Sequence, residues 1–257
     1  MIYQIFFIVI GLIIGSFLNV CIYRFPRNES VVMPGSHCPN CNQGINWFDN
    51  IPVLSYLILR GRCRNCKHRI SFRYPMVEIL TAVTLSCYYN LFGKGIVMTF
   101  LAIFTLGLIV AAFTDWETRT IPDEVSLGIL PLGFIFSFFN PVFKELYTWN
   151  PLAVSLIGAS AGALIIYVTG VLGKLAFKKE AMGFGDVKFM ALIGAFLGYK
   201  LVILSYFIAP FLALSYGVYR KIRYKDDYLP YGPFLAIAAL VVLFFGEKLI
   251  NIIFYLQ

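Results

Sequence analysis

The sequence predicts an all-α protein that crosses a membrane about eight times and has one sizeable polar loop, between its first two transmembrane helices. Of the 257 residues, 60% are hydrophobic and only 13% are charged, and the mean hydropathy is +0.79. These values are far from those of a soluble domain. The apolar residues also gather in windows long enough to cross about 30 Å of hydrocarbon. The sequence therefore excludes an ordinary soluble globular fold.

The predicted transmembrane segments follow one another with short connections after the first loop. They are residues 2–22, 74–92, 95–114, 122–140, 151–177, 187–199, 200–219 and 231–256. Segment 187–199 is short, so a re-entrant or tilted segment is the alternative there. No small-residue cleavage site follows the first apolar run, and this favours a retained helix over a removed signal peptide. The predicted organisation is a first transmembrane helix (1–22), a polar domain (23–73) and a seven-helix membrane domain (74–257).

The distribution of basic residues predicts the orientation in the membrane. If loop 23–73 is cytoplasmic, alternation places 17 of the 21 Lys and Arg residues on the cytoplasmic side. The opposite side then holds Lys94, Lys144, Lys200 and Lys248. Such an excess is typical of cytoplasmic loops, so both termini are predicted to lie outside. The formal charge of +8 is explained in this way, and no basic run indicates nucleic-acid binding.

Four of the six cysteines form two C-x-x-C motifs in the polar loop. Cys38 and Cys41 make the first motif, and Cys63 and Cys66 make the second, 21 residues further on. Four thiolates around one ion are the usual ligands of structural zinc, and this spacing lies just beyond the usual range. Two disulfides are the alternative, which a reducing cytoplasm disfavours. A loop of about 50 residues with few large apolar side chains needs such a metal to fold.

Two aspartates near the cytoplasmic ends of predicted helices are candidates for catalysis. Asp186 lies in the sequence Gly183-Phe184-Gly185-Asp186-Val187-Lys188 at the start of an apolar segment. An ionised carboxylate at the border of the bilayer is costly and indicates function, unless the helix dipole at a first turn explains it. Asp115 lies at the end of its helix, where the dipole disfavours a carboxylate. If the two helices pack together, the pair can share a proton and act as base and acid.

Several other residues have both a functional and a structural interpretation. Gly183 and Gly185 allow close backbone approach beside the carboxylate. Asp123 has a structural explanation because it begins a helix after Pro122. Glu78 either pairs with Arg73 or contacts a substrate or cofactor, and Lys188 either steadies a carboxylate or lies among lipid headgroups. Asn19 either packs against another helix or contacts substrate.

The order of these motifs resembles the type IV prepilin peptidase family, whose members are GxGD-type aspartic proteases. The resemblance extends from residue 15 to residue 236 and covers nearly the whole chain. It is carried by Gly15-Ser16-Phe17-Leu18-Asn19-Val20 with Tyr23-Arg24 and Pro26, the two C-x-x-C motifs, Arg73-Tyr74-Pro75 with Glu78, Asp115 with Ile121-Pro122-Asp123, Gly183 to Lys188, and Gly232-Pro233-Phe234-Leu235-Ala236.

The resemblance implies a bifunctional enzyme of the bacterial inner membrane. Asp115 and Asp186 fall on the catalytic aspartates, which hydrolyse the bond after a Gly at the end of the basic leader of a prepilin or pseudopilin. The new N-terminus is then methylated with S-adenosylmethionine as the methyl donor, and these enzymes serve type IV pilus and type II secretion systems. The resemblance assigns no residue of this chain to the methyl donor.

Three alternatives compete with the bifunctional enzyme. The first is a leader peptidase without methyltransferase activity, and the second is a proton-coupled transporter in which the intramembrane acids bind ions. A transporter is expected to show inverted repeats, and the sequence has no such repeat. The third is a zinc-stapled assembly scaffold without catalysis. The prepilin that is cut, the oligomeric state and the residues that bind S-adenosylmethionine cannot be read from the sequence.

Overall fold

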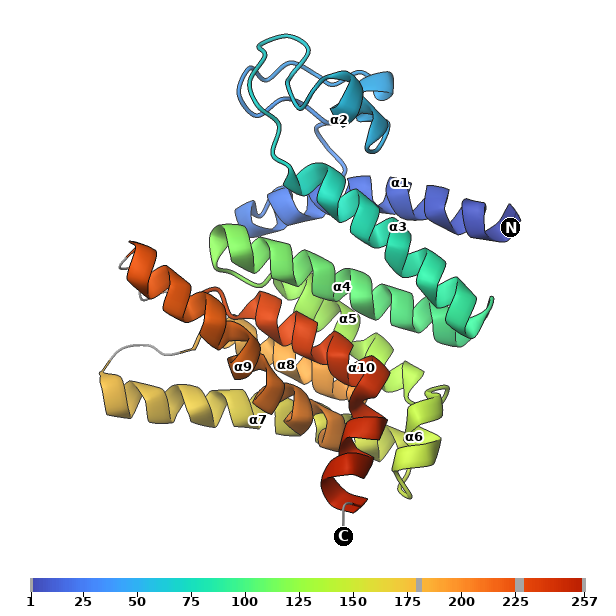
Figure 1. Ribbon diagram of the computed structural model, residues 1–257, viewed down its shortest axis with the longest axis vertical. Coiled ribbons are helices and arrows are strands. Elements are labelled where there is room, and N and C mark those ends of the chain that lie inside the picture. Colours follow the sequence, from blue (N-terminus) through green and yellow to red (C-terminus); the bar gives the residue numbers. More distant parts are fainter. Residues whose placement is uncertain (1, 179–181, 225–228, 256–257) are drawn as a thin grey trace. The chain divides into compact units, whose positions relative to one another are not determined.

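A computed structural model describes residues 2–178, 182–224 and 229–255 (Figure 1). Every regular element in these ranges is a helix, which confirms the predicted all-α class. The elements are α1 (Ile2–Arg24), η1 (Phe25–Arg27), η2 (Trp47–Asn50), α2 (Leu54–Ile58), α3 (Arg73–Phe92), α4 (Ile96–Thr118), α5 (Asp123–Phe136), α6 (Pro141–Leu146), α7 (Pro151–Phe177), α8 (Phe184–Leu197), α9 (Tyr199–Tyr224) and α10 (Gly232–Tyr255).

Among the described residues, five helices are long and apolar enough to cross a membrane, which supports a multi-pass protein. They are α1, α4, α7, α9 and α10. The other three predicted segments correspond to α3, α5 and α8, so the count of eight stays a prediction. Helices α5 and α8 have 14 residues each, which is about 21 Å at the usual rise. The predicted segment 122–140 is longer than α5. Lys179 and Lys225, which contribute to the charge asymmetry, lie outside the described residues.

The chain forms two compact units that divide within α4, Met1–Ala102 and Ile103–Gln257. In the first unit, α1 packs against α3 through two glycines one turn apart. A Cβ atom on Gly11 would lie 2.4 Å from the Cα of Ala82, and one on Gly15 would lie 2.6 Å from the Cα of Glu78. The two backbones therefore touch, as they do in the small-xxx-small packing of membrane helices.

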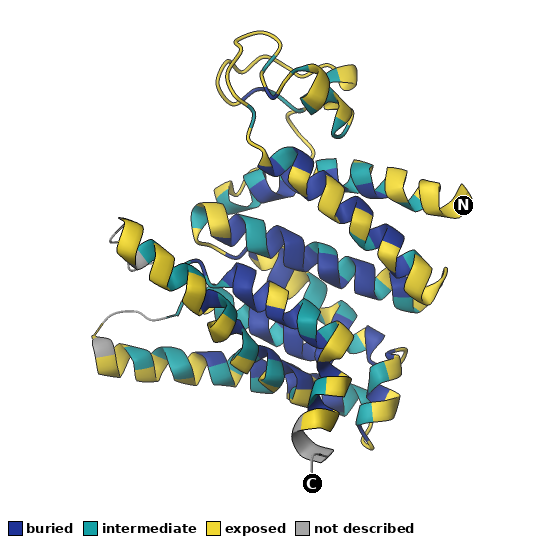
Figure 2. Cartoon of the chain, viewed as in Figure 1, coloured by how far each residue is buried: buried dark blue, intermediate teal, exposed yellow. Residues whose placement is uncertain are grey.

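The polar loop of the first unit has almost no core of its own. Between residues 25 and 72, only Cys38 and Gly61 are buried, and Figure 2 shows the rest of this segment mainly as exposed or intermediate. Its first part is tied to α1 by Arg24, whose buried guanidinium donates hydrogen bonds to the carbonyl oxygens of Ser30 at 2.7 Å and Pro34 at 2.6 Å. Hydrophobic burial therefore contributes little to the stability of this loop.

Helix α8 forms the centre of the second unit. It packs against α5, α7, α9 and α10 (Figure 1). Its residues from Phe189 onward are buried, apart from Ala191. The contact with α7 is again made through glycine, because a Cβ atom on Gly194 would lie 2.0 Å from the carbonyl oxygen of Gly158.

The C-terminal end of α8 lies inside protein, where its last carbonyl groups need hydrogen-bond partners. Three side chains supply them. Ser155 donates to the oxygen of Ala195 at 2.6 Å, Asn140 to that of Phe196 at 3.0 Å and Tyr147 to that of Leu197 at 3.3 Å. A helix that is surrounded and capped by its neighbours does not need the length of a lipid-facing helix. This explains why a central segment of the unit is short.

Candidate functional site: two carboxylates and a four-cysteine cluster

Asp186 lies in the first turn of α8, as the sequence predicted. Gly183 is the N-cap residue, and its backbone N–H donates to Oδ2 of Asp186 at 3.1 Å. The N–H of Asp186 in turn donates to the carbonyl oxygen of Gly183 at 3.2 Å. The carboxylate thus satisfies one of the free donors at the helix start, where the helix dipole also favours negative charge. These contacts agree with the structural interpretation of Asp186, and the hydrogen bond with Gly183 fixes the direction of its side chain.

Asp115 lies in the last turns of α4 and is buried, with 6% of its surface exposed. Its Oδ2 atom accepts a hydrogen bond of 2.8 Å from the backbone N–H of Gly232, the first residue of α10. A Cβ atom on Gly232 would lie 2.9 Å from the same oxygen. Because only glycine leaves room for the carboxylate here, the start of α10 is shaped around Asp115.

The second unit brings the two aspartates together from helices that are far apart in the sequence. The carboxylates of Asp115 and Asp186 are close enough to repel each other electrostatically. Two carboxylates in a poorly hydrated place cannot both ionise easily, so they tend to share one proton. Such a pair can hold one group as a base and the other as an acid, which is what hydrolysis of a peptide bond requires.

Lys188 and Asp123 connect the starts of α8 and α5. The Nζ atom of Lys188 lies 2.7 Å from Oδ1 and 2.8 Å from Oδ2 of Asp123. Of the two interpretations of Lys188, the one in which it steadies a carboxylate matches this contact, although the carboxylate is not Asp186. Gly185 lies beside this pair, and a Cβ atom on it would lie 3.3 Å from the Cβ of Ile121. The segment before α5 therefore passes close to Gly185, the residue before Asp186.

The four cysteines of the first unit converge on one point, as their spacing predicted. The Sγ atoms of Cys38, Cys41, Cys63 and Cys66 all lie within 4.8 Å of one another, and those of Cys38 and Cys66 are 3.8 Å apart. With Zn–S bonds of about 2.3 Å, the sulfur atoms of a tetrahedral site are about 3.8 Å apart. The donor set and its geometry thus fit a tetrahedral metal ion, and the cysteines are free rather than paired in disulfides.

The two C-x-x-C motifs form matching turns. The N–H of Cys38 donates to the oxygen of Gln43, and that of Cys63 donates to the oxygen of His68. Each turn contains a residue with a positive φ after its second cysteine, Asn42 at 56° and Lys67 at 59°. The repetition places two sulfur atoms of each motif on one side of its turn, which is how two turns can complete one metal site.

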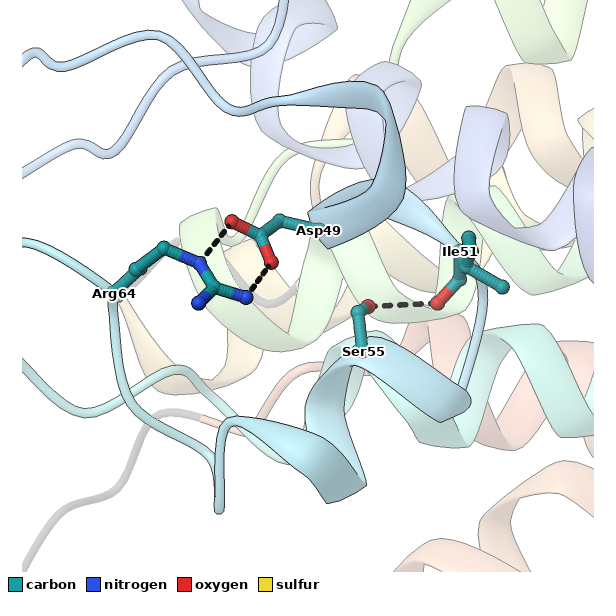
Figure 3. Close-up of polar contacts among 4 residues, drawn as sticks. All are labelled: Asp49, Ile51, Ser55 and Arg64. Carbon is teal, nitrogen blue, oxygen red and sulfur yellow. Dashed lines mark hydrogen bonds and ion pairs between the residues drawn. The ribbon is translucent and has the colours of Figure 1, made fainter.

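The thiol of Cys66 is activated by local hydrogen bonds. The backbone N–H of His68 and the side-chain amide of Asn40 lower the pKa of Cys66 to about 6. Arg64, two residues before Cys66, makes two hydrogen bonds of 2.6 and 2.7 Å with Asp49 (Figure 3), which lower the pKa of that carboxyl group.

Asn19 and Glu78 both connect parts of the first unit. The amide of Asn19 donates to the carbonyl oxygens of Gly15 at 3.2 Å and Tyr74 at 3.0 Å, a contact of the kind that the packing interpretation predicts. Glu78 is buried, and its Oε2 atom accepts a hydrogen bond of 2.7 Å from the N–H of Val53. The backbone of Val53 has φ of 61°, which is unusual for a β-branched residue. Glu78 therefore anchors a strained part of the loop to α3.

Sequence reasoning missed two features beside the aspartates. Gly232 belongs to one of the motifs but was given no role, although its N–H holds Asp115. Tyr231 was not considered at all. The hydroxyl of Tyr231 is buried without a hydrogen-bond partner and lies within electrostatic range of Asp186. Both residues precede an apolar segment in the pattern Tyr-Gly-Pro, and this break before a helix was the available signal.

Comparisons with known proteins agree with these motifs. Residues 9–92 match the bacterial peptidase A24 N-terminal domain, and residues 102–218 match the type IV leader peptidase family. The prepilin leader peptidase/N-methyltransferase of Pseudomonas putida is 34% identical, covering 94% of this chain and 90% of its own. The proteins of that name from Aeromonas hydrophila and Dichelobacter nodosus are 33% and 34% identical, covering 93% and 95% of this chain and 89% and 93% of their own. No solved structure matches the chain. The chain therefore belongs to the type IV leader peptidase family.

Proposed function

We propose that this protein removes the basic leader peptide from type IV prepilins and pseudopilins, by cutting after Gly with Asp115 and Asp186. The observation that carries the proposal is that these two carboxylates belong to one helical unit and interact electrostatically. Each is held by a backbone N–H at the start of a helix, so their positions do not depend on flexible side chains. The family and the names of the relatives supply the substrate class.

The reaction follows that of other paired carboxylates. The ionised aspartate takes a proton from water, whose oxygen attacks the carbonyl carbon of the scissile peptide, while the protonated aspartate gives its proton to the carbonyl oxygen. The resulting diol then collapses: the C–N bond breaks, the amine nitrogen takes the proton held by the first aspartate, and the second aspartate recovers its proton from a hydroxyl group. The pair returns to its starting state.

Surrounding residues support this pair in the proposal. Gly183 orients Asp186, Gly185 lets the chain before α5 approach, and the Lys188–Asp123 pair fixes the starts of α5 and α8. In the first unit, Asn19 and Glu78 tie α1, α3 and the polar loop together.

The second proposed activity is methylation of the new N-terminus with S-adenosylmethionine. It rests on the relatives' names. Zinc is the ion that the four cysteines are proposed to hold, for the sake of the loop's structure, because a closed set of four thiolate ligands leaves no open coordination position for substrate. A peptidase without the methyltransferase activity is the alternative.

The proposed location is the bacterial inner membrane, with loop 23–73 in the cytoplasm and both termini outside. The excess of basic residues on one side supports this orientation. In this orientation Asp115 and Asp186 would lie at the cytoplasmic face. A substrate with its helix in the bilayer and its leader in the cytoplasm exposes the junction between helix and leader at that face. In this organisation residues 1–22 are the first transmembrane helix, 23–73 the zinc-binding domain and 74–257 the peptidase domain.

One assay tests both activities. The purified full chain is incubated with a prepilin and isotopically labelled S-adenosylmethionine, and the product mass is measured. Loss of the leader with a labelled methyl group on the product supports both activities, and loss of the leader alone supports the peptidase alternative. Asp115→Asn and Asp186→Asn are the matched variants, and each is expected to slow cleavage by about 10³-fold or more. Cleavage at the normal rate by either variant would refute the paired-aspartate mechanism.

A further inference from the structure

Among the described residues of the second unit, the hydroxyl group of Tyr231 is the buried side-chain polar group for which the structure shows no hydrogen-bond partner. Its oxygen is inaccessible to solvent and has no hydrogen-bond partner, although the residue as a whole is only partly buried. Buried hydroxyl groups in native proteins are almost always hydrogen-bonded, because losing water without gaining a partner is unfavourable. An exception beside the two aspartates makes this hydroxyl a candidate donor to a group that binds there.

The position of Tyr231 connects it to both aspartates. Its carbonyl oxygen accepts hydrogen bonds from the N–H groups of Phe234 and Leu235, each 3.1 Å long, so the first turn of α10 fixes its backbone. The next residue, Gly232, donates its N–H to Asp115. The hydroxyl at the other end of the side chain lies within electrostatic range of Asp186. The backbone of Gly232 therefore holds Asp115, and the side chain of the preceding residue, Tyr231, interacts electrostatically with Asp186.

A second tyrosine in the same neighbourhood shows what a satisfied hydroxyl looks like. Tyr206 of α9 interacts electrostatically with Tyr231, and its hydroxyl forms a hydrogen bond of 2.9 Å with Oγ1 of Thr169 on α7. Tyr206 therefore serves to join α7 and α9. Tyr231 makes no such link, so its hydroxyl remains free to donate to a group that enters beside the aspartates.

We propose that the Tyr231 hydroxyl donates a hydrogen bond to the carbonyl oxygen of the scissile peptide bond. This inference rests on the proposed peptidase function. As water attacks the carbonyl carbon, negative charge develops on that oxygen until an aspartate protonates it, and a fixed donor stabilises this charge more than that of the resting carbonyl. The tyrosine keeps its own proton throughout, so the balance of the reaction is unchanged.

The test compares Tyr231→Phe with Tyr206→Phe in the full chain, using a prepilin substrate. Tyr231→Phe keeps the ring and removes only the hydroxyl. It is expected to lower kcat by about 10²-fold while KM, the unfolding temperature and the pH dependence of kcat stay unchanged. Tyr206→Phe removes a hydroxyl that has a structural partner, so it is expected to lower the unfolding temperature. Its kcat should stay within about twofold of the wild-type value, a much smaller change than the loss of an oxyanion donor causes.

Three outcomes would overturn the inference. Normal kcat in Tyr231→Phe would show that the hydroxyl takes no part in the reaction. A fall in kcat that comes with a fall in the unfolding temperature would assign it a structural role. A displaced limb of the pH profile would mean that it binds a carboxylate instead. Asp186→Asn, measured in parallel, separates the two proposals, because a normal rate in that variant counts against the peptidase mechanism itself, whereas the results for Tyr231→Phe count only against the role of Tyr231.

Discussion

The polar loop 25–72 and helix α8 differ most in what surrounds their side chains. Within the loop only Cys38 and Gly61 are buried, whereas most of α8 from Phe189 onward is buried by four neighbouring helices. With the proposed zinc site, the loop gains its order from four thiolates and a metal ion, whereas α8 gains its order from close packing. Each region is expected to lose its structure when its own source of stability is removed. It is expected to keep its structure when the source of stability of the other region is removed.

Removing the metal is the largest change expected in the comparison. Structural zinc contributes about 10–16 kcal/mol to small domains that it folds, so chelation or Cys63→Ser should unfold the loop. Hydrogen exchange is then expected to speed up at the turn amides of Asn42 and Lys67, while the amides of α8 stay protected. Cys87→Ser is the matched control because Cys87 is an exposed cysteine of α3 outside the cluster. A loop that keeps its protection without metal would contradict the comparison.

The complementary experiment disrupts the packing of α8 at its contact with α7 and leaves the cysteine cluster unchanged. Gly194→Ala places a methyl group 2.0 Å from the carbonyl oxygen of Gly158, so the helices must separate. The expected cost is about 3 kcal/mol, at the upper end of overpacking effects, and is measured by thermal unfolding in detergent. Metal content per chain should not change, because the cysteines belong to the other unit.

Gly128→Ala provides the control for this overpacking. Gly128 lies in α5 with no atom within 4 Å of the position of an added Cβ. Alanine is expected to stabilise an exposed helical position by about 0.5–1 kcal/mol relative to glycine. If the two alanine variants had equal stability, close backbone contact would not be the source of order in α8.

A smaller effect is expected from the ion pair between α8 and α5. The side chains of Lys188 and Asp123 are 23% and 57% exposed, so the pair should contribute less than about 1 kcal/mol to stability. Lys188→Met and Asp123→Asn are each expected to slow cleavage a few-fold, since the pair lies two residues from Asp186. The double variant should resemble either single one, as expected of one shared contact. Additive losses of activity would mean that the two residues act separately. Lys144→Met on α6 is the control for the loss of one positive charge.

The sequence predicted these two regions unequally, for a physical reason. The cysteine cluster could be read from spacing alone, because two C-x-x-C motifs determine which atoms meet. The meeting of Asp115 and Asp186 could be stated only as a condition, since it depends on how α4 packs with α8, and periodicity does not reveal the neighbours of a helix that is apolar on all sides. Glycine spacing carried an unused signal, because Gly11 and Gly15, and likewise Gly158 and Gly162, repeat at one helical turn and mark backbone contacts.

Side-chain contacts in the loop were beyond sequence reasoning as well, and the Arg64–Asp49 pair supplies the smallest prediction. Arg64 lies between Cys63 and Cys66 of the cysteine cluster, and its two hydrogen bonds to Asp49 hold this turn (Figure 3). Asp49→Asn removes the charge while keeping the shape. Metal binding, measured by competition with a chelator, should weaken by about two- to threefold, in line with the modest effect of exposed ion pairs. Glu29→Gln makes the same charge change elsewhere in the loop and should have no effect.

The pH dependence of the difference in metal affinity between Asp49→Asn and the wild type follows from the lowered pKa of Asp49. The stabilisation is present wherever the carboxylate is ionised, which is above the unfolded pKa of about 3.9, and it is lost only as the pH falls through the lower folded value. Between pH 6 and pH 8, the ratio of the metal dissociation constants of variant and wild type should therefore stay constant, although both constants rise as the thiols become protonated. A ratio that changes across this interval would show that Asp49 acts through a titrating thiol and not through its ion pair with Arg64.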